Sequence, residues 1–419
     1  MMRTRLRDDC FALPPGIEWT PVDEALARLR AAVTPVTASE VVALDAAAGR
    51  ILAEPVVARH TNPPRTNSAV DGFGFAWASL DGREEGNLVL IEGRAAAGHP
   101  WPGRVPPGAA IRILTGAEIP EGVDTVVLQE DAEVVRDRVR FSAPRRKGSN
   151  LRPAGEDAKA GEEVLPAGRR LTPADLARAA VVGVGQVTVR LPLRVGVLST
   201  GDELVEPGSG GEGIGDANRP MLKALAAAQG FMPVDLGIAR DREQAVRAAL
   251  DRGAAEADAI LTSGGASSGD EDHISRLLRE EGRISTWRIA IKPGRPLALG
   301  FWRGVPVFGL PGNPVAAFVT FLIFARPALG VMAGRDWHEP RGFLVPAAFA
   351  KQKKAGRREY LRARIGADGR VEAFHSEGSG LVGGLSWSEG LVELPDEAMT
   401  IRPGDPVRFL PYAGFGLAP

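Results

Sequence analysis

Residues 194–203 read RVGVLSTGDE, and residues 259–272 read AILTSGGASSGDED. Each stretch is a run of apolar side chains that ends in a polar turn containing glycine, as a buried strand does. Strands that alternate with helices are typical of a parallel sheet covered by helices, so the sequence predicts an α/β domain over residues 191–334. The same alternation continues in strand-like runs at 233–238 and 305–310 and in helical patterns at 242–252 and 272–281. A further helix is expected after the first strand, with Asn218 as its cap and Gly230 at its end.

The rest of the 419-residue chain predicts further domains, because one ordinary core cannot hold this length. Residues 61–148 are rich in glycine, proline and short β-type runs, which indicates a small β-rich domain. The flanking segments 15–60 and 149–190 are expected to form one discontinuous linker domain. Within the first segment, residues 22–32 have apolar side chains at helical spacing, which predicts a helix. Residues 335–419 contain short, evenly spaced strand patterns, which favour a terminal β-barrel. The expected fold class is therefore a multidomain α/β and β protein.

Composition excludes several classes of function. The formal net charge is −1 with 25% charged residues, so neither nucleic acid nor an anionic membrane is an expected partner. Cys10 is the one cysteine, which excludes an internal disulfide and a multi-cysteine zinc site and fits a reducing compartment. Residues 1–15 lack the apolar core of a signal peptide. The apolar stretch 315–332 is interrupted by Arg326 and Pro327, which predicts a buried helix and a cytoplasmic protein.

The chemistry is expected where the predicted strands end, because ligands bind at the carboxyl ends of the strands in an open parallel sheet. The glycine-rich loop 263–272 opens a helix, and such a loop favours an anion, typically phosphate. Carboxylates at the same edge would repel phosphate, and Mg²⁺ resolves the conflict because it binds hard oxygen ligands and phosphate together. The carboxylates are Glu203, Asp241, Asp270 and Asp272, and added positive charge comes from Lys292 and Arg295. These residues indicate metal-assisted chemistry on a phosphorylated ligand.

Each of these residues also has a purely structural explanation. Glu203 can cap a turn, Asp272 can cap its helix, and Lys292 can lie on a solvated face. Tight loops need glycine with or without a ligand, and proline fixes the shape of a loop. The chain has no G-x-S-x-G elbow, no complete Walker lysine loop and no histidine-rich zinc pattern. Those absences exclude the common serine hydrolase, P-loop and zincin interpretations.

Taken together, the motifs resemble those of the MoeA/gephyrin-type molybdopterin molybdotransferases. The α/β segment carries four of them in the family's order: TGDEL at 200–204, SGG through Asp272 at 263–272, KPGRP at 292–296 and GLPGNP at 309–314. Other stretches that match the family are NSAVDG at 67–72, LTGA at 114–117 with Pro120, GED at 155–157, GSG at 378–380 and GL at 390–391. The resemblance runs from about residue 15 to residue 410.

The resemblance implies an elongated homodimer of four domains, one of them discontinuous, with an α/β domain of the molybdopterin-binding type. The active cleft would lie between the α/β domain of one subunit and the small β-rich domain of the other. The implied reaction inserts molybdate into adenylylated molybdopterin, releases AMP and gives the molybdenum cofactor with the help of a divalent metal such as Mg²⁺.

Residue roles follow from the same motifs. The implied catalytic residues are Asp71, Thr115, Asp157, Glu203, Asp241, Asp272 and Lys292, of which Glu203, Asp241 and Asp272 would hold the metal. The implied cofactor-binding residues are Thr200, Gly201, Ser263, Gly264, Gly265, Ser267, Arg288, Arg295, Pro311 and Pro314. Two departures stand out: the loop 265–269 reads GASSG where the family has GVSVG, and Arg295 replaces the family's second lysine.

Two other functions stay open. A molybdopterin adenylyltransferase shares the α/β domain but usually lacks the other three. A non-catalytic scaffold of the gephyrin type would not need the full set of carboxylates. An adenylyltransferase is also a candidate partner, docking on the surface to deliver the nucleotidylated intermediate.

Overall fold

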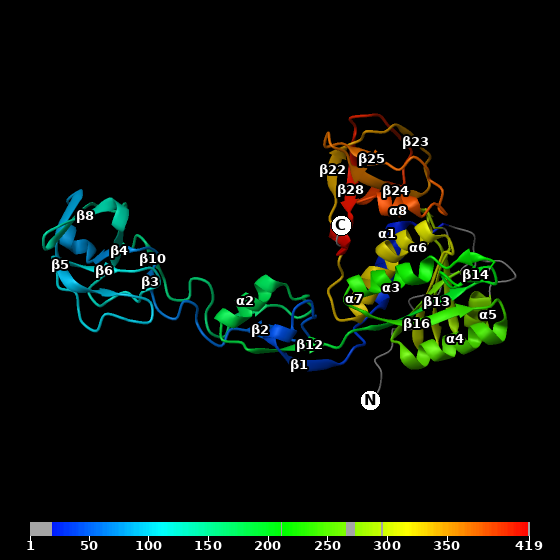
Figure 1. Ribbon diagram of the computed structural model, residues 1–419, viewed down its shortest axis with the longest axis horizontal. Coiled ribbons are helices and arrows are strands. Elements are labelled where there is room, and N and C mark those ends of the chain that lie inside the picture. Colours follow the sequence, from blue (N-terminus) through cyan, green and yellow to red (C-terminus); the bar gives the residue numbers. More distant parts are fainter. Residues whose placement is uncertain (1–18, 211, 265–272, 295, 418–419) are drawn as a thin grey trace.

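The computed structural model describes residues 19–210, 212–264, 273–294 and 296–417. They form an elongated molecule with four parts (Figure 1). A distal lobe, residues 67–152, stands at one end, and a narrow middle part, residues 39–57 and 163–190, joins it to the rest. The α/β part, residues 22–32 and 194–332, and the C-terminal part, residues 343–415, lie together at the other end. The multidomain α/β and β fold is as expected, while the precise domain boundaries stay a prediction.

The α/β part is built on a six-stranded sheet with the strand order β16-β13-β17-β21-β20-β18. Its first four strands run parallel, as the sequence predicts. The last two are antiparallel and were not predicted, since residues 283–302 show no clear period. The bounds are β13 Arg194–Thr200, β16 Met232–Ala239, β17 Ala259–Ser263, β18 Arg283–Arg288, β20 Pro296–Trp302 and β21 Val305–Leu310. The helices around the sheet include α3 Asn218–Ala228, α4 Glu243–Glu256 and α5 His273–Glu280.

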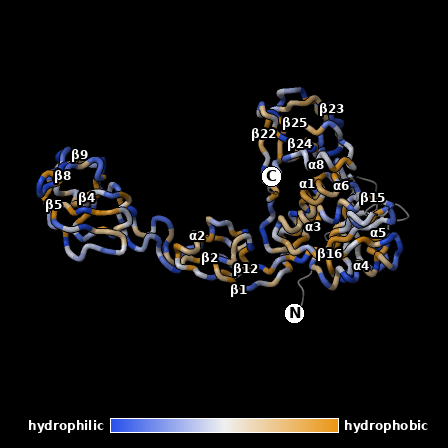
Figure 2. Tube along the Cα trace, in the orientation of Figure 1, coloured by the Kyte–Doolittle hydropathy of each residue, from blue (hydrophilic) through white to orange (hydrophobic). Residues whose placement is uncertain are grey.

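The most apolar helix lies inside the α/β part. Three segments form one helical stretch from Pro314 to Met332: α6 Pro314–Thr320, a π-helical turn Phe321–Ala325 and α7 Arg326–Met332. By length and composition the stretch could cross a membrane, but 94% of its most apolar window is buried within the protein. Hydrophobic residues, drawn in orange, gather in this part of the molecule around α1 and α6 (Figure 2). The prediction of a buried core helix is therefore confirmed.

Helix α1, Val22–Ala32, packs into the same core although the chain then leaves for the middle part. Val22, Ala25 and Leu29 are each at most 1% exposed and belong to the cluster that contains Leu193 and Phe321. Their spacing of three and four residues places them on one helical face. The α/β part therefore includes a segment from the start of the described chain.

The distal lobe is a six-stranded sheet with the order β7-β4-β6-β5-β9-β8. Its bounds are β4 Gly72–Phe75, β5 Glu85–Ala95, β6 Ala109–Ile113, β7 Thr125–Leu128, β8 Ala132–Val135 and β9 Arg138–Ser142. Phe73, Phe75 and Phe141 fill one of its cores. The short pair β3 Asn67–Ser68 and β10 Leu151–Arg152 closes the base of the lobe.

The middle part consists of two small antiparallel pairs and one helix. Strand β1, Ser39–Ala43, pairs with β12, Gln186–Arg190, and β2, Val56–Val57, pairs with β11, Glu163–Leu165. Helix α2, Pro173–Val181, begins with a capping box between Thr172 and Asp175. Because each pair joins the segment before the distal lobe to the segment after it, the chain passes twice through this part.

The C-terminal part is joined to the α/β part by a shared sheet of order β19-β24-β26-β28-β22, in which β25 also pairs with β24. Strand β19, Ile291–Lys292, comes from the α/β part and adds to the edge at β24. A second pair, β23 Lys351–Lys353 and β27 Met399–Ile401, helps enclose the core around Phe409. The other bounds are β22 Phe343–Pro346, β24 Arg358–Ile365, β25 Val371–Ala373, α8 Gly383–Trp387, β26 Gly390–Leu394 and β28 Pro406–Pro411.

The distal lobe depends on a glycine at position 72. A Cβ added at Gly72 would lie 1.8 Å from the carbonyl oxygen of Val127 on the neighbouring strand, so Gly72→Ala must push β4 and β7 apart. We expect a loss of about 2 kcal/mol in the stability of the lobe, measured as faster proteolysis within residues 67–152. Gly185→Ala is the control, because nothing lies within 4 Å of its added Cβ. Equal proteolysis of both variants would contradict this packing.

Candidate active site

The carboxyl ends of β13, β17 and β21 lie side by side at one edge of the sheet. Thr200 and Ser263 end neighbouring strands and are buried, with 8% and 3% of their surface exposed. Gly264 follows with a φ of +87°, and a Cβ there would lie 2.9 Å from the carbonyl oxygen of Thr200. A Cβ at Gly312 would in turn lie 3.7 Å from the Cα of Gly264. The positive φ and the close contact with Thr200 show why glycine is needed at position 264, and the contact with Gly312 places the ends of β17 and β21 together.

Asn218 links the segments that follow β17 and β21, and it was not predicted as a site residue. Its side-chain Nδ2 donates to Ser263 Oγ at 2.5 Å and to the carbonyl oxygen of Gly312 at 2.6 Å. The sequence was interpreted as placing Asn218 at the cap of α3, which is wrong. Asp216 has that role, because its Oδ1 accepts from the backbone N–H groups of Asn218 and Arg219 at 3.1 Å each. The side chain of Asn218 is therefore available to bond Ser263 and Gly312 and to hold the segments after β17 and β21 together.

Two of the predicted carboxylates are at this edge. The loops after β13 and β16 are tied together, since Asp241 N donates to Asp202 Oδ1 at 3.1 Å and Asp202 N donates to Asp241 Oδ2 at 3.4 Å. Glu203 is exposed, and its carboxylate covers Gly201, where an added Cβ would lie 2.5 Å from Glu203 Oε2. Asp202 thus joins Glu203 and Asp241 as a third acidic residue, and only its place in a TGDE motif could have indicated this. Within the described part of the chain, no three His, Cys, Asp or Glu side chains form a ready metal cage.

Lys292 reaches this region from the shared sheet. Its loop packs on α6, because a Cβ at Gly294 would lie 2.8 Å from Thr320 Cγ2. Pro311 is buried directly after β21, and Pro314 is the first residue of α6, so both shape the loop that ends at this helix. The Nζ of Lys292 forms ion pairs with Glu377 and, at 3.6 Å, with Glu359, both from the C-terminal part. Lys292 is therefore held by two carboxylates in this structure.

Several predicted residues lie outside the described part of the chain. They are Gly265, Ser267, Asp272 and Arg295, together with the side chain of Arg288, whose backbone belongs to β18. The predicted metal set of Glu203, Asp241 and Asp272 therefore stays a prediction.

The remaining predicted residues lie away from the α/β part of the same chain. In the distal lobe, Asp71 Oδ1 accepts from both the backbone N–H and the Oγ1 of Thr115, each at 2.7 Å. These bonds lower the pKa of Asp71 and keep it ionised. Asp157 lies at the junction with the middle part, where its carboxylate accepts from Asn62 Nδ2 at 3.0 Å. Figure 1 shows the distal lobe at the opposite end of the molecule from the α/β sheet.

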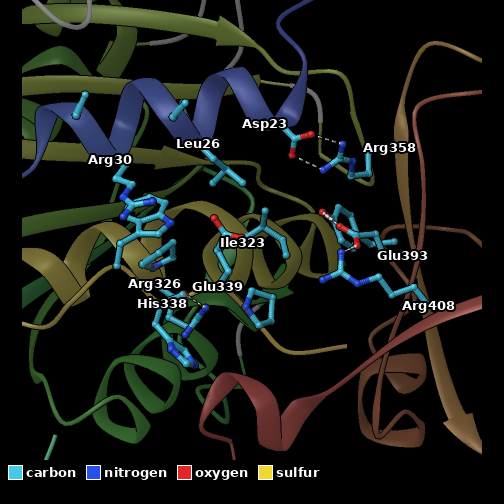
Figure 3. A pocket seen from close by; sticks show the side chains of 16 residues that line it. Asp23, Leu26, Arg30, Ile323, Arg326, His338, Glu339, Arg358, Glu393 and Arg408 are labelled. Carbon is cyan, nitrogen blue, oxygen red and sulfur yellow. Dashed lines mark hydrogen bonds and ion pairs between the residues drawn. The ribbon is translucent and has the colours of Figure 1, made fainter. Parts of the chain in front are cut away.

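A separate cavity of about 690 Å³ lies between α1, the helical stretch 314–332 and the C-terminal sheet (Figure 3). Arg358 lines this cavity and donates hydrogen bonds to both carboxylate oxygens of Asp23, at 2.6 and 2.8 Å. None of the predicted site residues lines this cavity. This cavity is therefore separate from the strand ends at which the predicted residues lie.

Three family models match successive stretches of the chain. The MoeA N-terminal region (domain I and II) matches residues 20–183, a probable molybdopterin binding domain matches 196–330, and the MoeA C-terminal region (domain IV) matches 345–412. The matches cover all four parts of the structure, including the distal lobe.

Relatives and solved structures agree with these matches. The chain is 34% identical over 400 residues to a molybdopterin molybdenumtransferase of Haemophilus influenzae, covering 93% of this chain and 98% of that protein. It is 32% identical to molybdopterin molybdenumtransferase 2 of Mycobacterium tuberculosis, covering 90% and 95%. The molybdopterin biosynthesis MoeA protein of Pyrococcus horikoshii superposes with a TM-score of 0.80 at 29% identity, covering 94% and 100%. The chain therefore belongs to the MoeA family.

Proposed function

We propose that this protein is a molybdopterin molybdenumtransferase, which inserts molybdate into adenylylated molybdopterin and releases AMP. The observation that carries the proposal is the meeting of the ends of β13, β17 and β21 at one edge of the sheet, where Asn218 bonds both Ser263 and Gly312. Full-length similarity to enzymes of that name supports the same activity. In this role the buried loop ends Thr200 and Ser263 would line the phosphate side of the ligand, and Lys292 would face its anionic groups.

The proposal includes Mg²⁺. Asp202, Glu203 and Asp241 supply hard carboxylate oxygens from two adjacent loops, and the exposed Glu203 is open to a ligand, so the donors fit this ion in kind. Glu203 and Asp241 would hold the metal with Asp272. A bound Mg²⁺ would neutralise phosphate charge at the edge. The chain's own residues would orient the ligand there and keep its phosphates beside Lys292.

The proposal also includes a homodimer with shared sites. Asp71 and Thr115 form an exposed pair with no other predicted site residue beside it in the same lobe. Within one chain the length of the molecule separates this pair from the strand ends of the α/β part. A second copy, related by a two-fold axis, would bring the distal lobe of one subunit to the α/β part of the other.

The proposal is tested by ligand-induced stabilisation and by AMP release. Adenylylated molybdopterin should raise the melting temperature far more than ATP does at equal concentration, because a ligand that binds only the native state stabilises it by mass action. Molybdate with Mg²⁺ should then release AMP. Glu203→Gln should suppress the Mg²⁺-dependent release without lowering the melting temperature of the free protein. Formation of adenylylated molybdopterin from ATP and molybdopterin, with no response to molybdate, would instead identify an adenylyltransferase.

A scaffold of the gephyrin type would show neither reaction. The α/β part with three further parts disfavours the adenylyltransferase, and the paired acidic loops at Asp202 and Asp241 disfavour the scaffold. We further propose a cytoplasmic location, supported by a single cysteine and by the buried apolar helix. An adenylyltransferase that hands over its product remains the partner we propose.

A further inference from the structure

A four-residue charge cluster joins the α/β part to the C-terminal part. Two lysines, Lys292 and Lys351, alternate with two glutamates, Glu359 and Glu377. Lys351 Nζ lies 3.2 Å from Glu359 Oε2 and also pairs with Glu377, which in turn pairs with Lys292. With two positive and two negative groups the cluster is neutral. Both ammonium groups are therefore already supplied with a counter-ion from within the chain.

The two glutamates differ in how firmly they are placed. Glu359 lies within strand β24, where its backbone is opposite Lys292 and Leu394, and its side chain is 8% exposed. Glu377 lies in the loop between β25 and α8, and its side chain is 44% exposed. The sheet thus fixes the position of Glu359, whereas the side chain of Glu377 can rotate into solvent.

The backbone around Glu377 is nevertheless anchored. Arg362, which is 4% exposed, donates through its Nη2 to the carbonyl oxygens of Ser376 and Gly378, the residues on either side of Glu377. Two residues on, the carbonyl oxygen of Ser379 accepts from the N–H of Val315 at the start of α6. The loop is therefore docked on the candidate site, and the carboxylate of Glu377 can leave the lysines by side-chain rotation alone.

We propose that Glu377 is an internal counter-ion that occupies the anion position between Lys292 and Lys351 and is displaced by the oxyanion substrate. The inference rests on the proposed function in that it takes a small tetrahedral oxyanion as the incoming ligand. Lys351 then becomes the second ammonium group of that position, while Glu359 stays in place and keeps Lys351 oriented. Glu377 is a specificity-determining residue in this account, because only an anion that binds two lysines better than a carboxylate does can replace it.

The test measures binding of molybdate alone, at constant ionic strength and without pterin, by isothermal titration calorimetry of the full chain. Glu377→Gln keeps the shape of the side chain but removes the competing charge. We expect its dissociation constant for molybdate to fall about tenfold, since the ion pairs of Glu377 with Lys292 and Lys351 no longer have to be broken. Adding Lys351→Met to this variant should cancel the gain. Glu372→Gln is the matched control, because Glu372 pairs with Arg364 at 3.0 Å on the exposed side of β24 and β25.

The outcomes separate two roles for Glu377. It is either a counter-ion that the substrate displaces or a structural latch, meaning a residue whose ion pairs only stabilise the contact between the α/β part and the C-terminal part. A latch predicts a lower melting temperature for Glu377→Gln and unchanged or weaker molybdate binding, and that result overturns the proposal. In turnover, the proposal predicts a lower KM for molybdate with kcat unchanged. Because the binding measurement needs no turnover, the absence of AMP release in the wild type would reject the proposed function while leaving the counter-ion result to be judged separately.

Discussion

Mixing two inactive variants, Asp71→Ala and Lys292→Ala, is expected to restore about a quarter of the wild-type rate of AMP release. Asp71 belongs to the distal lobe and Lys292 to the α/β part, and these two parts lie at opposite ends of the molecule. In a homodimer with shared sites, each mixed dimer has one cleft with both changes and one cleft with neither. Random exchange makes about half of the dimers mixed, and half of their clefts are intact.

A second mixture controls for this result. Asp241→Ala and Lys292→Ala both change the α/β part, so every cleft in their mixed dimer carries one change and no activity should return. The subunits are exchanged by co-expression with two different tags. The unfractionated mixture is assayed, and capture through both tags shows that mixed dimers are present. Recovery in both mixtures, or in neither when mixed dimers are present, contradicts the shared cleft.

Replacing Arg219 with methionine is expected to destabilise the protein by about 3 kcal/mol, because it leaves the buried carboxylate of Asp216 without its cationic partner and Asp235 with Lys223 alone. Arg219 is 7% exposed and pairs with Asp235 at 2.6 Å, with Asp216 at 3.2 Å and with Glu206. The side chain of Asp216 is 1% exposed, so water cannot replace the lost guanidinium there. The measurement is the free energy of unfolding in urea at pH 7. Arg370→Met, which breaks an exposed pair with Asp368, should cost under about 1 kcal/mol.

The difference in unfolding free energy between the wild type and Arg219→Met should depend on pH. Burial alone would raise the pKa of Asp235, but hydrogen bonds from Lys223, Arg219 and the N–H of Gly237 outweigh it and lower the pKa to about 2. A group with a depressed pKa stabilises the fold above its unfolded value, 3.8, and loses that contribution as the pH falls through the folded value. The gap in stability between wild type and Arg219→Met should therefore be constant above pH 4 and narrow between about pH 4 and pH 2. A constant gap across that range would show that Asp235 does not depend on Arg219.

The elements that sequence patterns predicted well are those whose burial is regular. Helix α1 was predicted at Val22–Ala32, its observed bounds, because one apolar face packs into a single core. The strands that became β17 and β21 are buried over their whole length and gave continuous apolar runs. Strands β18 and β20 were missed because residues 283–302 show no clear period. They extend the sheet antiparallel beyond β21, with β18 at its edge.

The candidate site was predictable only in part. Motif positions placed Thr200, Ser263 and Gly264 at one edge, since parallel strands end on the same side of a sheet. Sequence could not reveal that Asn218 would hold Ser263 and Gly312, because a polar residue at the start of a helix also fits a cap. Nor could it reveal that Glu377, 85 residues after Lys292, would neutralise that lysine. Such pairings depend on how whole parts of the chain dock.

Because the chain passes twice between the middle part and the distal lobe, a single proteolytic cut there does not release the lobe. Between the middle part and the distal lobe, the two passages are bonded to each other: Asn62 N donates to the carbonyl oxygen of Ala158 at 2.8 Å, and Gly155 N to that of Pro63 at 2.9 Å. A protease that cuts one passage leaves the lobe tethered by the other. The nicked protein would elute at its original size and separate into fragments only in detergent.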